Sequence, residues 1–111
     1  MKKAEWQAAL QRGAYEPASL ASEGFVHCSK REQTVATANR FFRAEPDLVL
    51  LCIEPQRLTA DLRLEAPANR GDDRAHELFP HVYGPINLDA VTKVVELPCE
   101  PDDSFRLPSG L

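Results

Sequence analysis

Residues 47–53 read Asp47-Leu48-Val49-Leu50-Leu51-Cys52-Ile53, and every position after the aspartate is apolar. Side chains of a strand alternate between its two faces, so a run that is apolar at both sets of positions is typical of a strand covered on both sides. We therefore expect a central strand here. Runs of this kind also bury enough apolar surface to offset the entropy of ordering the chain, which excludes a disordered protein.

A helix is predicted just before this strand. Ser29-Lys30-Arg31-Glu32 has the spacing of a capping box, in which the first hydroxyl and the last carboxylate satisfy free backbone amides of the helix start. The helix should run to about residue 42, with a buried face formed by Val35, Ala38, Phe41 and Phe42. It follows a short strand over residues 25–28.

A shorter helix is predicted near the start of the chain, over residues 3–12. Trp6, Ala9 and Leu10 share one face at helical spacing, and Gly13 provides a left-handed stop. Residues 14–24 are rich in Ser, Ala, Glu and Pro, and we expect them to connect this helix to the strand that follows.

Mostly strands are predicted after the central run. Asp61-Leu62-Arg63-Leu64-Glu65 alternates cleanly, which places Arg63 and Glu65 on one face of a strand. The remaining expected elements are a turn over 55–58, a polar loop over 66–78, extended pieces over 79–86, a helical turn over 87–90, and strands over 91–97 and 105–107. This order lacks regular strand–helix alternation, which predicts an α+β fold in a single domain over residues 1–111, with a flexible tail from about residue 108.

The charge of the chain argues against non-specific nucleic-acid binding. Its 111 residues carry a net charge of −4, with 13 Lys and Arg against 17 Asp and Glu, and the basic residues are scattered. A protein that binds a nucleic-acid backbone needs a basic stripe to displace counterions. A local basic pocket for a small anion is still compatible with this composition.

The composition also predicts a cytoplasmic protein without a membrane partner. No apolar run approaches the roughly 20 residues that a membrane-spanning helix needs, and the polar residues from Glu5 onward do not suit a signal peptide. The three cysteines, Cys28, Cys52 and Cys99, form neither an even disulfide set nor a Cys-x-x-Cys pair.

The first candidate for chemistry is His27, two residues before Ser29. On a strand these two side chains point the same way, and Cys28 points to the opposite face. The free amides of a helix start attract anions, so His27 beside them is placed to hydrogen-bond a ribose hydroxyl or a phosphate. The alternative is that His27 is a satisfied core histidine and Ser29 is only a cap.

Two further pairs are candidates. His81 and Tyr83 share a face of an extended segment, where two polar-tipped rings can stack on a planar base; the alternative is an aromatic corner that buries both rings. The spacing of Arg63 and Glu65 suits an ion pair, and it also suits an acid–base or anion-binding role beside a pocket. Exposed pairs of this kind are usually only solvated.

A metal site is not expected. The histidines, His27, His76 and His81, form no His-Glu-x-x-His motif and no tight ligand pair, even with Asp72, Asp73 or Glu77. Cys28 is not expected to be a nucleophile, because His27 points to the other face of the strand and cannot act as its base.

Several segments form a recognisable set: Gly24-Phe25-Val26-His27-Cys28-Ser29, Gln33, Thr37-Ala38-Asn39-Arg40-Phe41-Phe42, Asp47-Leu48-Val49-Leu50-Leu51, Leu62-Arg63-Leu64-Glu65 and Phe79-Pro80-His81-Val82-Tyr83-Gly84-Pro85-Ile86. Together they resemble an uncharacterised bacterial family called domain of unknown function 952. The resemblance extends from about residue 6 to residue 108, and the combination of the first and last segments is specific.

This resemblance implies a fold similar to that of the ADP-ribosyltransferases, whose split, strongly bent sheets hold NAD, with two to three helices here. It implies a small-molecule ligand such as NAD, ADP-ribose or a related nucleotide, with NAD as a substrate rather than a resident cofactor. By position, His27 would hold the ribose, Ser29 would meet the nicotinamide amide, and Tyr83 would be the stacking aromatic.

The candidate site residues fall into two groups. Those expected to take part in catalysis are His27, Glu65 and His81, and those expected to bind the ligand are Ser29, Arg63, Tyr83 and Arg40. Transferases usually carry their catalytic glutamate on a late strand, where this chain offers only Glu96. A non-catalytic module that binds a small anion or a partner protein is therefore the alternative function.

Overall fold

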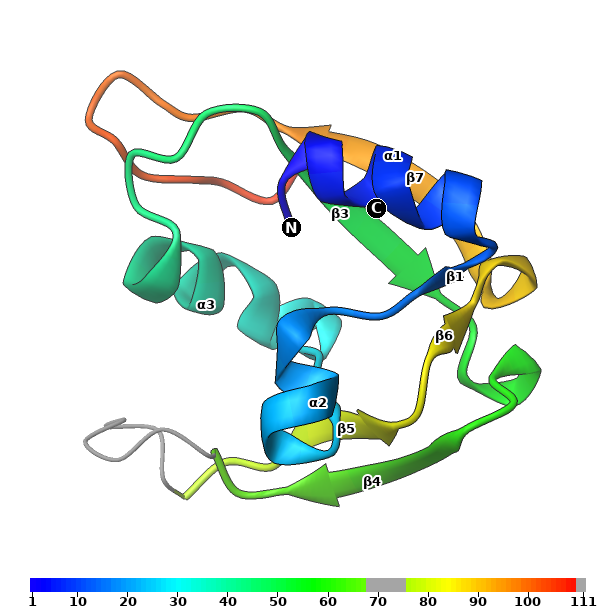
Figure 1. The fold of residues 1–111 in the computed structure, drawn as a ribbon. Helices are drawn as coiled ribbons and strands as arrows, with labels where there is room; N and C mark the ends of the chain where they lie inside the picture. The colour runs from blue at the N-terminus through cyan, green and yellow to red at the C-terminus, as the bar shows by residue number, and fades with distance from the viewer. Residues whose placement is uncertain (68–75, 110–111) are drawn as a thin grey trace.

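The computed structural model describes residues 1–67 and 76–109 and confirms the predicted α+β fold (Figure 1). The helices and strands of the described residues are α1 (Lys3–Arg12), β1 (Ala14–Tyr15), α2 (Ala18–Glu23), β2 (Val26–His27), α3 (Thr34–Phe41), β3 (Leu48–Ile53), β4 (Asp61–Glu65), β5 (Phe79–Tyr83), β6 (Ile86–Asn87) and β7 (Val91–Leu97). Short 3₁₀ turns are η1 (Arg31–Gln33), η2 (Pro55–Arg57) and η3 (Leu88–Ala90).

All strand pairs in the described residues are antiparallel. β3 pairs with β7, β5 lies between β2 and β4, and the two-residue strands β1 and β6 pair with each other. In Figure 1 β3 and β7 lie beside α1 at the top, β5 and β4 lie at the bottom, and α3 stands at one side. The molecule is therefore built on two separate main sheets, and β1 with β6 lies between them.

The predicted central strand, β3, is fully covered only in its first half. Leu48 and Val49 are buried, whereas residues 50–53 are partly exposed. β7 pairs along one edge of β3. On the other edge, the described residues form a single β-bridge, between Lys2 and Leu48 at the start of β3. The expectation of cover on both faces was wrong for the second half, because Leu50 and its neighbours line a cavity there.

α1 forms and ends as predicted. Gly13 takes a left-handed φ of 94°, and its amide donates a hydrogen bond of 2.9 Å to the carbonyl of Ala9. Ala9 is buried and Trp6 is partly buried, but Leu10 is 52% exposed, so the predicted apolar face is buried only in part. α1 lies along one side of the molecule (Figure 1), and Ala9 is its one buried residue.

Residues 14–24 are more ordered than the predicted connector. They contain β1 and α2, and α2 ends at Gly24, which takes a left-handed φ of 87°. α2 spans only six residues, Ala18–Glu23, none of which is buried. A helix this short shows no periodic apolar face, so the pattern that predicts helices does not detect it.

The helix after β2 begins later than predicted, and Ser29 is not its cap. Gln33 takes the role expected of Glu32: the backbone N–H of Lys30 donates a hydrogen bond of 2.9 Å to Gln33 Oε1. This shifts the start of the helical segment to Arg31. Ser29 is left outside it, and its Oγ donates to Thr37 Oγ1 at 3.1 Å.

Two buried clusters form the core. One contains Ala38, Leu48, Leu97 and Phe105, and the other contains Val26, Val82 and Ile86.

Residues 105–107 are not a strand, which corrects the prediction for them. The Asn39 side chain takes the place of a strand partner: its Oδ1 accepts the backbone N–H of Phe105 at 2.7 Å, and its Nδ2 donates to the Phe105 carbonyl at 3.4 Å. Phe41, expected in the buried face of α3, is 46% exposed.

Some predicted features lie outside the described residues. Residues 68–75 include most of the expected polar loop, together with Asp72 and Asp73, and residues 110–111 belong to the expected tail. In the parts of the chain that the structure does describe, no helix has the length and apolar character needed to cross a membrane.

Candidate functional site

The register of β2, β5 and β4 brings the predicted site residues together. His27 of β2 lies opposite His81 of β5, and His81 lies opposite Arg63 of β4, so the three side chains project from one face of this sheet. Tyr83 and Glu65, each two residues further along its strand, share that face. The sequence predicted each pair separately; the strand pairing unites them.

Phe25 lies at the centre of this group, although it was not among the predicted site residues. Its ring stacks on the His81 ring with centroids 4.1 Å apart, and it contacts the rings of His27 at 4.8 Å and Tyr83 at 5.4 Å. The two histidine rings meet edge to face at 5.5 Å. Phe25 precedes His27 by two residues in an extended segment, which is the spacing that signals a shared face. We call the six residues the Phe25 cluster: Phe25, His27, Arg63, Glu65, His81 and Tyr83.

Glu65 connects the two polar rings of β5. Its Oε1 accepts a hydrogen bond of 2.5 Å from the Tyr83 hydroxyl and lies 2.8 Å from Nδ1 of the buried His81. The hydrogen bond from Tyr83, followed by the one from His81, lowers the pKa of Glu65. The same hydrogen bond raises the pKa of Tyr83. Glu65 is therefore an ionised acceptor that fixes both rings, and it is a weak base.

The bond between Tyr83 and Glu65 predicts a measurable pKa change. We expect Tyr83→Phe to raise the pKa of Glu65 toward its ordinary value, because that bond is the largest cause of the lowering. NMR titration of the Glu65 carboxyl carbon measures the change. Tyr15→Phe is the control, because Tyr15 is no cause of the Glu65 shift. A Glu65 pKa that is the same in Tyr83→Phe and the wild type would contradict this geometry.

The sign of this shift also sets a dependence on pH. A carboxyl group whose pKa is lowered by folding stabilises the fold above its unfolded pKa. Its contribution is lost as the pH falls through the folded pKa. Acid should therefore destabilise the wild type through Glu65, and Tyr83→Phe should reduce this part of the pH dependence.

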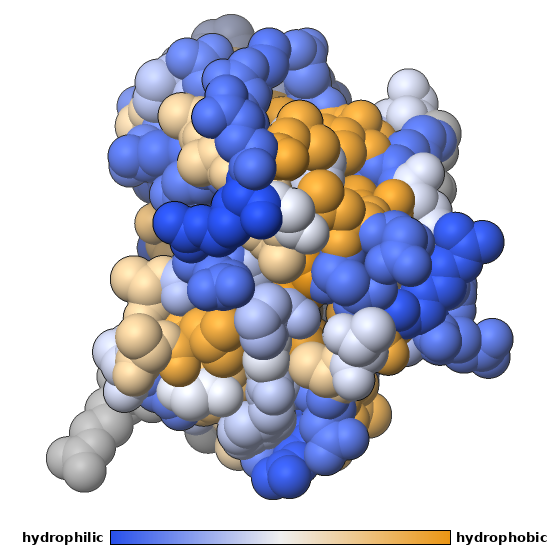
Figure 2. Space-filling view, turned by 45° about the vertical axis from the view of Figure 1, so that its right-hand side comes forward, coloured by the Kyte–Doolittle hydropathy of each residue, from blue (hydrophilic) through white to orange (hydrophobic). Residues whose placement is uncertain are grey.

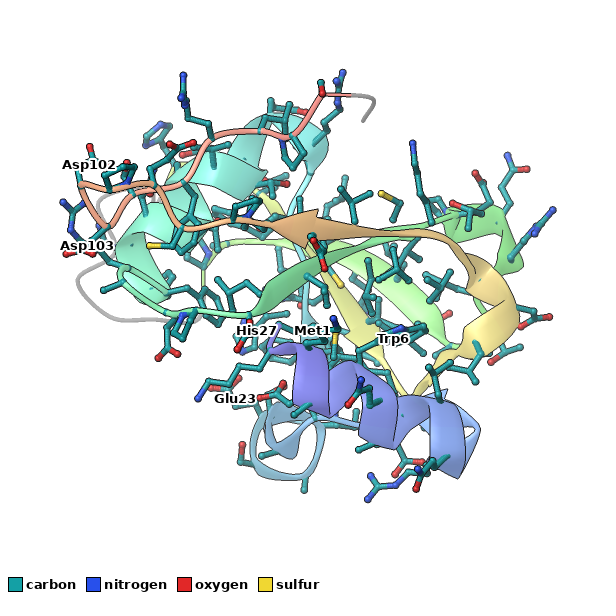
Figure 3. All side chains as sticks on the ribbon, turned by 90° about the horizontal axis from the view of Figure 1, so that it is seen from above. Met1, Trp6, Glu23, His27, Asp102 and Asp103 are labelled. Carbon is teal, nitrogen blue, oxygen red and sulfur yellow. The ribbon has the colours of Figure 1, made fainter. Side chains whose placement is uncertain are left out.

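His27 has a carboxylate partner that the sequence did not predict. Its Nε2 contacts Oε2 of Glu23, the last residue of α2, and both side chains are partly exposed (Figure 3). α2 was expected to be a connector, so its carboxylate could not be placed. The Phe25 cluster therefore holds two histidines, and each is paired with its own glutamate.

Arg63 covers one end of the cluster. Its guanidinium lies 4.5 Å from the centre of the Tyr83 ring and 3.6 Å from Oδ2 of Asp61. The Arg63 side chain is 57% exposed, so it keeps contact with solvent. Arg40, another predicted ligand-binding residue, lies on α3, where it is exposed and its guanidinium is 5.7 Å from the Phe41 ring. We do not include Arg40 in the cluster.

Cys28 points away from His27, as predicted. It packs against the core cluster of Val26, Val82 and Ile86. Burial raises the pKa of the Cys28 thiol to about 11, so the thiol is uncharged at neutral pH. This state does not suit a nucleophile.

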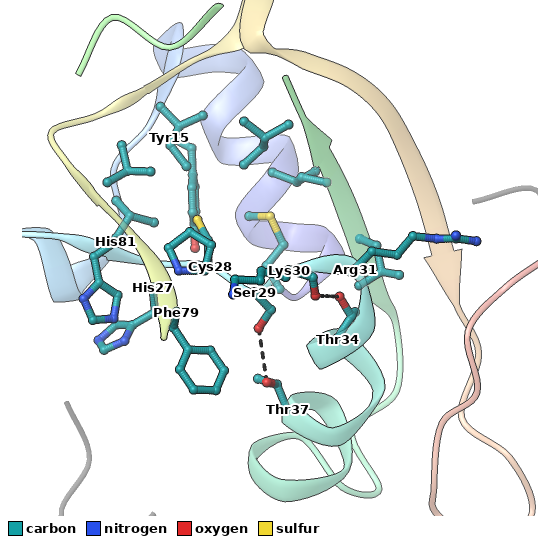
Figure 4. Close-up of a pocket in the computed structure, with 18 of the residues that line it drawn as sticks. Tyr15, His27, Cys28, Ser29, Lys30, Arg31, Thr34, Thr37, Phe79 and His81 are labelled. Atoms are coloured by element: carbon teal, nitrogen blue, oxygen red, sulfur yellow. Dashed lines mark hydrogen bonds between the residues drawn. The ribbon is translucent and has the colours of Figure 1, made fainter. Parts of the chain in front are cut away.

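The opposite side of this sheet borders a cavity of about 750 Å³ (Figure 4). Ser29, the remaining predicted site residue, lines this cavity with its partner Thr37, and His27 and His81 also reach its wall. Most of the wall is apolar and comes from both main sheets and α3. The structure thus divides the predicted residues between an outer sheet face, which carries the Phe25 cluster, and a cavity on the inner side.

Solved structures of a protein from Caulobacter crescentus are similar to this chain. The crystal structure of protein CC0527 from Caulobacter crescentus is 37% identical, with a TM-score of 0.81, and the match covers 96% of this chain and 90% of that chain. The solution NMR structure of CC0527 is 37% identical, with a TM-score of 0.79, and the match covers 100% of this chain and 91% of that chain. No curated protein matches the chain significantly. Residues 1–94 match a family model, so the chain belongs to the family described as "Protein of unknown function (DUF952)", as its motifs indicated.

Proposed function

We propose that the Phe25 cluster binds a nucleotide-like ligand of the NAD or ADP-ribose type. The observation that carries this proposal is the convergence of His27, His81 and Arg63 in one row across three strands, with aromatic rings beside them. This sheet face carries three kinds of group that suit the three parts of a nucleotide. The aromatic rings suit the planar base, the ionised carboxylate suits the ribose diol, and the guanidinium suits the phosphate.

Each part of the ligand has a counterpart in the cluster. Tyr83 and the partly exposed ring of Phe25 offer surfaces on which a base can stack. Glu65, held ionised by its hydrogen bonds, can accept a hydrogen bond from a ribose hydroxyl. The exposed guanidinium of Arg63 can donate to a phosphate in the bidentate geometry that this group favours.

The proposal includes a likeness to the split-sheet fold of the ADP-ribosyltransferases. Two observations support it: β3 with β7 and β2–β5–β4 are separate antiparallel sheets, and His27 lies on β2, a strand of the second of these sheets. If the domain is a transferase, Glu65 is the carboxylate of the cluster and is hydrogen-bonded to His81, and His27 and His81 would act with it.

A non-catalytic binding module is the second candidate, and the positions of two glutamates favour it. Glu96, the late-strand candidate for a catalytic carboxylate, lies on β7 in the other sheet, is 78% exposed and pairs with Lys3 at 3.7 Å. Glu65 is already engaged by Tyr83 and His81. A carboxylate held in this way serves recognition better than proton removal.

Calorimetry with NAD and ADP-ribose tests the proposed binding. We expect saturable binding that His27→Ala and Arg63→Ala each weaken about tenfold, which corresponds to the loss of one charge-assisted contact. Arg57→Ala, which removes another exposed arginine, in η2, is the control and should leave binding unchanged. No heat with either ligand, or equal weakening by Arg57→Ala, would contradict the proposal.

A turnover assay separates the two candidates. A transferase would release nicotinamide from NAD and would lose this activity in Glu65→Gln. A binding module would retain the ligand without turnover, and Glu65→Gln would then change affinity only.

A further inference from the structure

The cavity between the two main sheets is a second feature: His27 and His81 reach its wall, but the other residues of the Phe25 cluster do not line it. Its apolar wall includes Leu50, Leu51 and Ile53 of β3 on one side and Leu62, Leu64 and Val82 of β4 and β5 on the other. Leu62 and Leu64 alternate with Arg63 and Glu65, so they project from the opposite face of β4 to the Phe25 cluster. The cavity and the cluster are thus two sides of the same sheet.

An apolar cavity of about 750 Å³ favours an occupant. Unfilled apolar space destabilises a protein in proportion to its volume, and apolar cavities do not hold water well. Two residues of the wall also meet solvent, because Leu62 is 37% and Leu64 is 51% exposed. In Figure 2 apolar surface occupies the middle of the face shown, between polar margins. The volume lies in the range of small-molecule pockets, roughly 300–1,000 Å³.

Two polar groups of the cavity wall are uncharged at neutral pH. Cys28 and Tyr15 line it, and burial raises the pKa of the thiol to about 11 and that of the phenol to about 12. Among the described residues of the wall, Glu5 is the only acidic one. The interior therefore suits an uncharged, apolar chain.

Cationic and hydroxyl groups line one edge of the cavity, where α3 begins. Ser29 and Thr37 form a hydrogen bond there, and Thr34 donates from Oγ1 to the carbonyl of Lys30 at 3.0 Å (Figure 4). Lys30 lines the same edge, and within residues 1–67 and 76–109 we find no ion pair to its ammonium group. An anionic head group next to Lys30 would pair with this charge.

We propose that this cavity binds a fatty acid, with its hydrocarbon chain between the two sheets and its carboxylate beside Lys30. The apolar walls contact the chain, and the ammonium of Lys30 and the hydroxyls at the start of α3 bind the carboxylate. The proposal goes beyond the nucleotide site and rests on different side chains.

Titration with dodecanoate below its micelle concentration, followed by calorimetry, tests this site. We expect saturable binding, weakened about tenfold or more by Leu64→Arg, because a charged group then occupies the apolar wall. Lys30→Gln should weaken dodecanoate binding several-fold and leave binding of uncharged dodecanol unchanged. Leu10→Arg is the matched control, because Leu10 is as exposed as Leu64 but does not line the cavity.

A second measurement on the wild type keeps the test decisive if Leu64→Arg does not fold. Stearate with a nitroxide near its methyl end should broaden the methyl resonances of Leu50, Ile53 and Leu64 and leave those of Leu10 sharp.

Three results would overturn the proposal: no saturable dodecanoate binding, equal weakening by Leu10→Arg, or a dimer in sedimentation that Leu64→Arg dissociates. The last result would make a second copy of the chain the occupant. Binding of ADP-ribose is measured separately, so failure of either site is distinguishable from failure of the other.

Discussion

Replacement of Phe105 by alanine should lower the free energy of unfolding by about 3–5 kcal/mol, the usual cost of removing a buried phenylalanine side chain. Phe105 is 2% exposed and packs with Ala38, Leu48 and Leu97. It thus joins α3 to the sheet of β3 and β7. The side chain of Asn39 fixes the Phe105 backbone through two hydrogen bonds, so the surroundings have little freedom to close the space left by the ring.

Urea unfolding followed by circular dichroism measures this loss. Leu107→Ala is the control: Leu107 is 37% exposed and two residues away, and we expect its replacement to cost much less. If Phe105→Ala costs no more than Leu107→Ala, the segment after β7 does not form part of the core.

Alanine at position 84 should destabilise the protein by about 1–3 kcal/mol, as overpacking generally does. A Cβ on Gly84 would lie 2.8 Å from Cβ of Ala60, closer than two such atoms can approach. The structure shows that the close neighbour is the segment that leads into β4.

The double substitution Gly84→Ala with Ala60→Gly tests this cause directly. Removal of the Ala60 side chain creates room for the new methyl group, so the double variant should regain most of the stability that Gly84→Ala loses. Thermal unfolding of the single and double variants gives the coupling energy. Equal stabilities for Gly84→Ala and the double variant would mean that the contact with Ala60 does not determine the residue at position 84.

Much of the fold could be predicted because its elements carry local signals. α1 ends at Gly13 in the left-handed conformation that glycine favours, and the strict alternation of residues 61–65 matches β4. The turn after Pro55 and the strand over residues 91–97 also formed where expected. In each case the pattern is contained within a few neighbouring residues.

The errors have a common physical origin in contacts between distant parts of the chain. Phe105 resembles a strand residue in sequence, but its backbone partner is the side chain of Asn39, 66 residues away. Ser29 has the spacing of a helix cap, but the helical segment starts one residue later, after Lys30. The reason is Gln33, whose side chain accepts the Lys30 amide and also donates to the carbonyl of Leu78. Spacing alone carries no information about such partners.

The candidate site was predicted as separate pairs, and the strand register joins them. His81 and Tyr83, and Arg63 and Glu65, share faces because of their spacing, which the sequence displays. Their approach to His27 depends on the pairing of β5 with both β2 and β4, which no local pattern encodes. Glu23 was missed for the same reason, since its place beside His27 depends on α2.

NMR of the imidazole side chains during titration with ADP-ribose tests the central claim most directly. His27 and His81 belong to the Phe25 cluster, whereas the exposed His76 does not and serves as an internal reference. We expect the resonances of His27 and His81 to shift together with one dissociation constant while those of His76 stay in place. Resonances of His27 and His81 that do not move at millimolar ADP-ribose would contradict it.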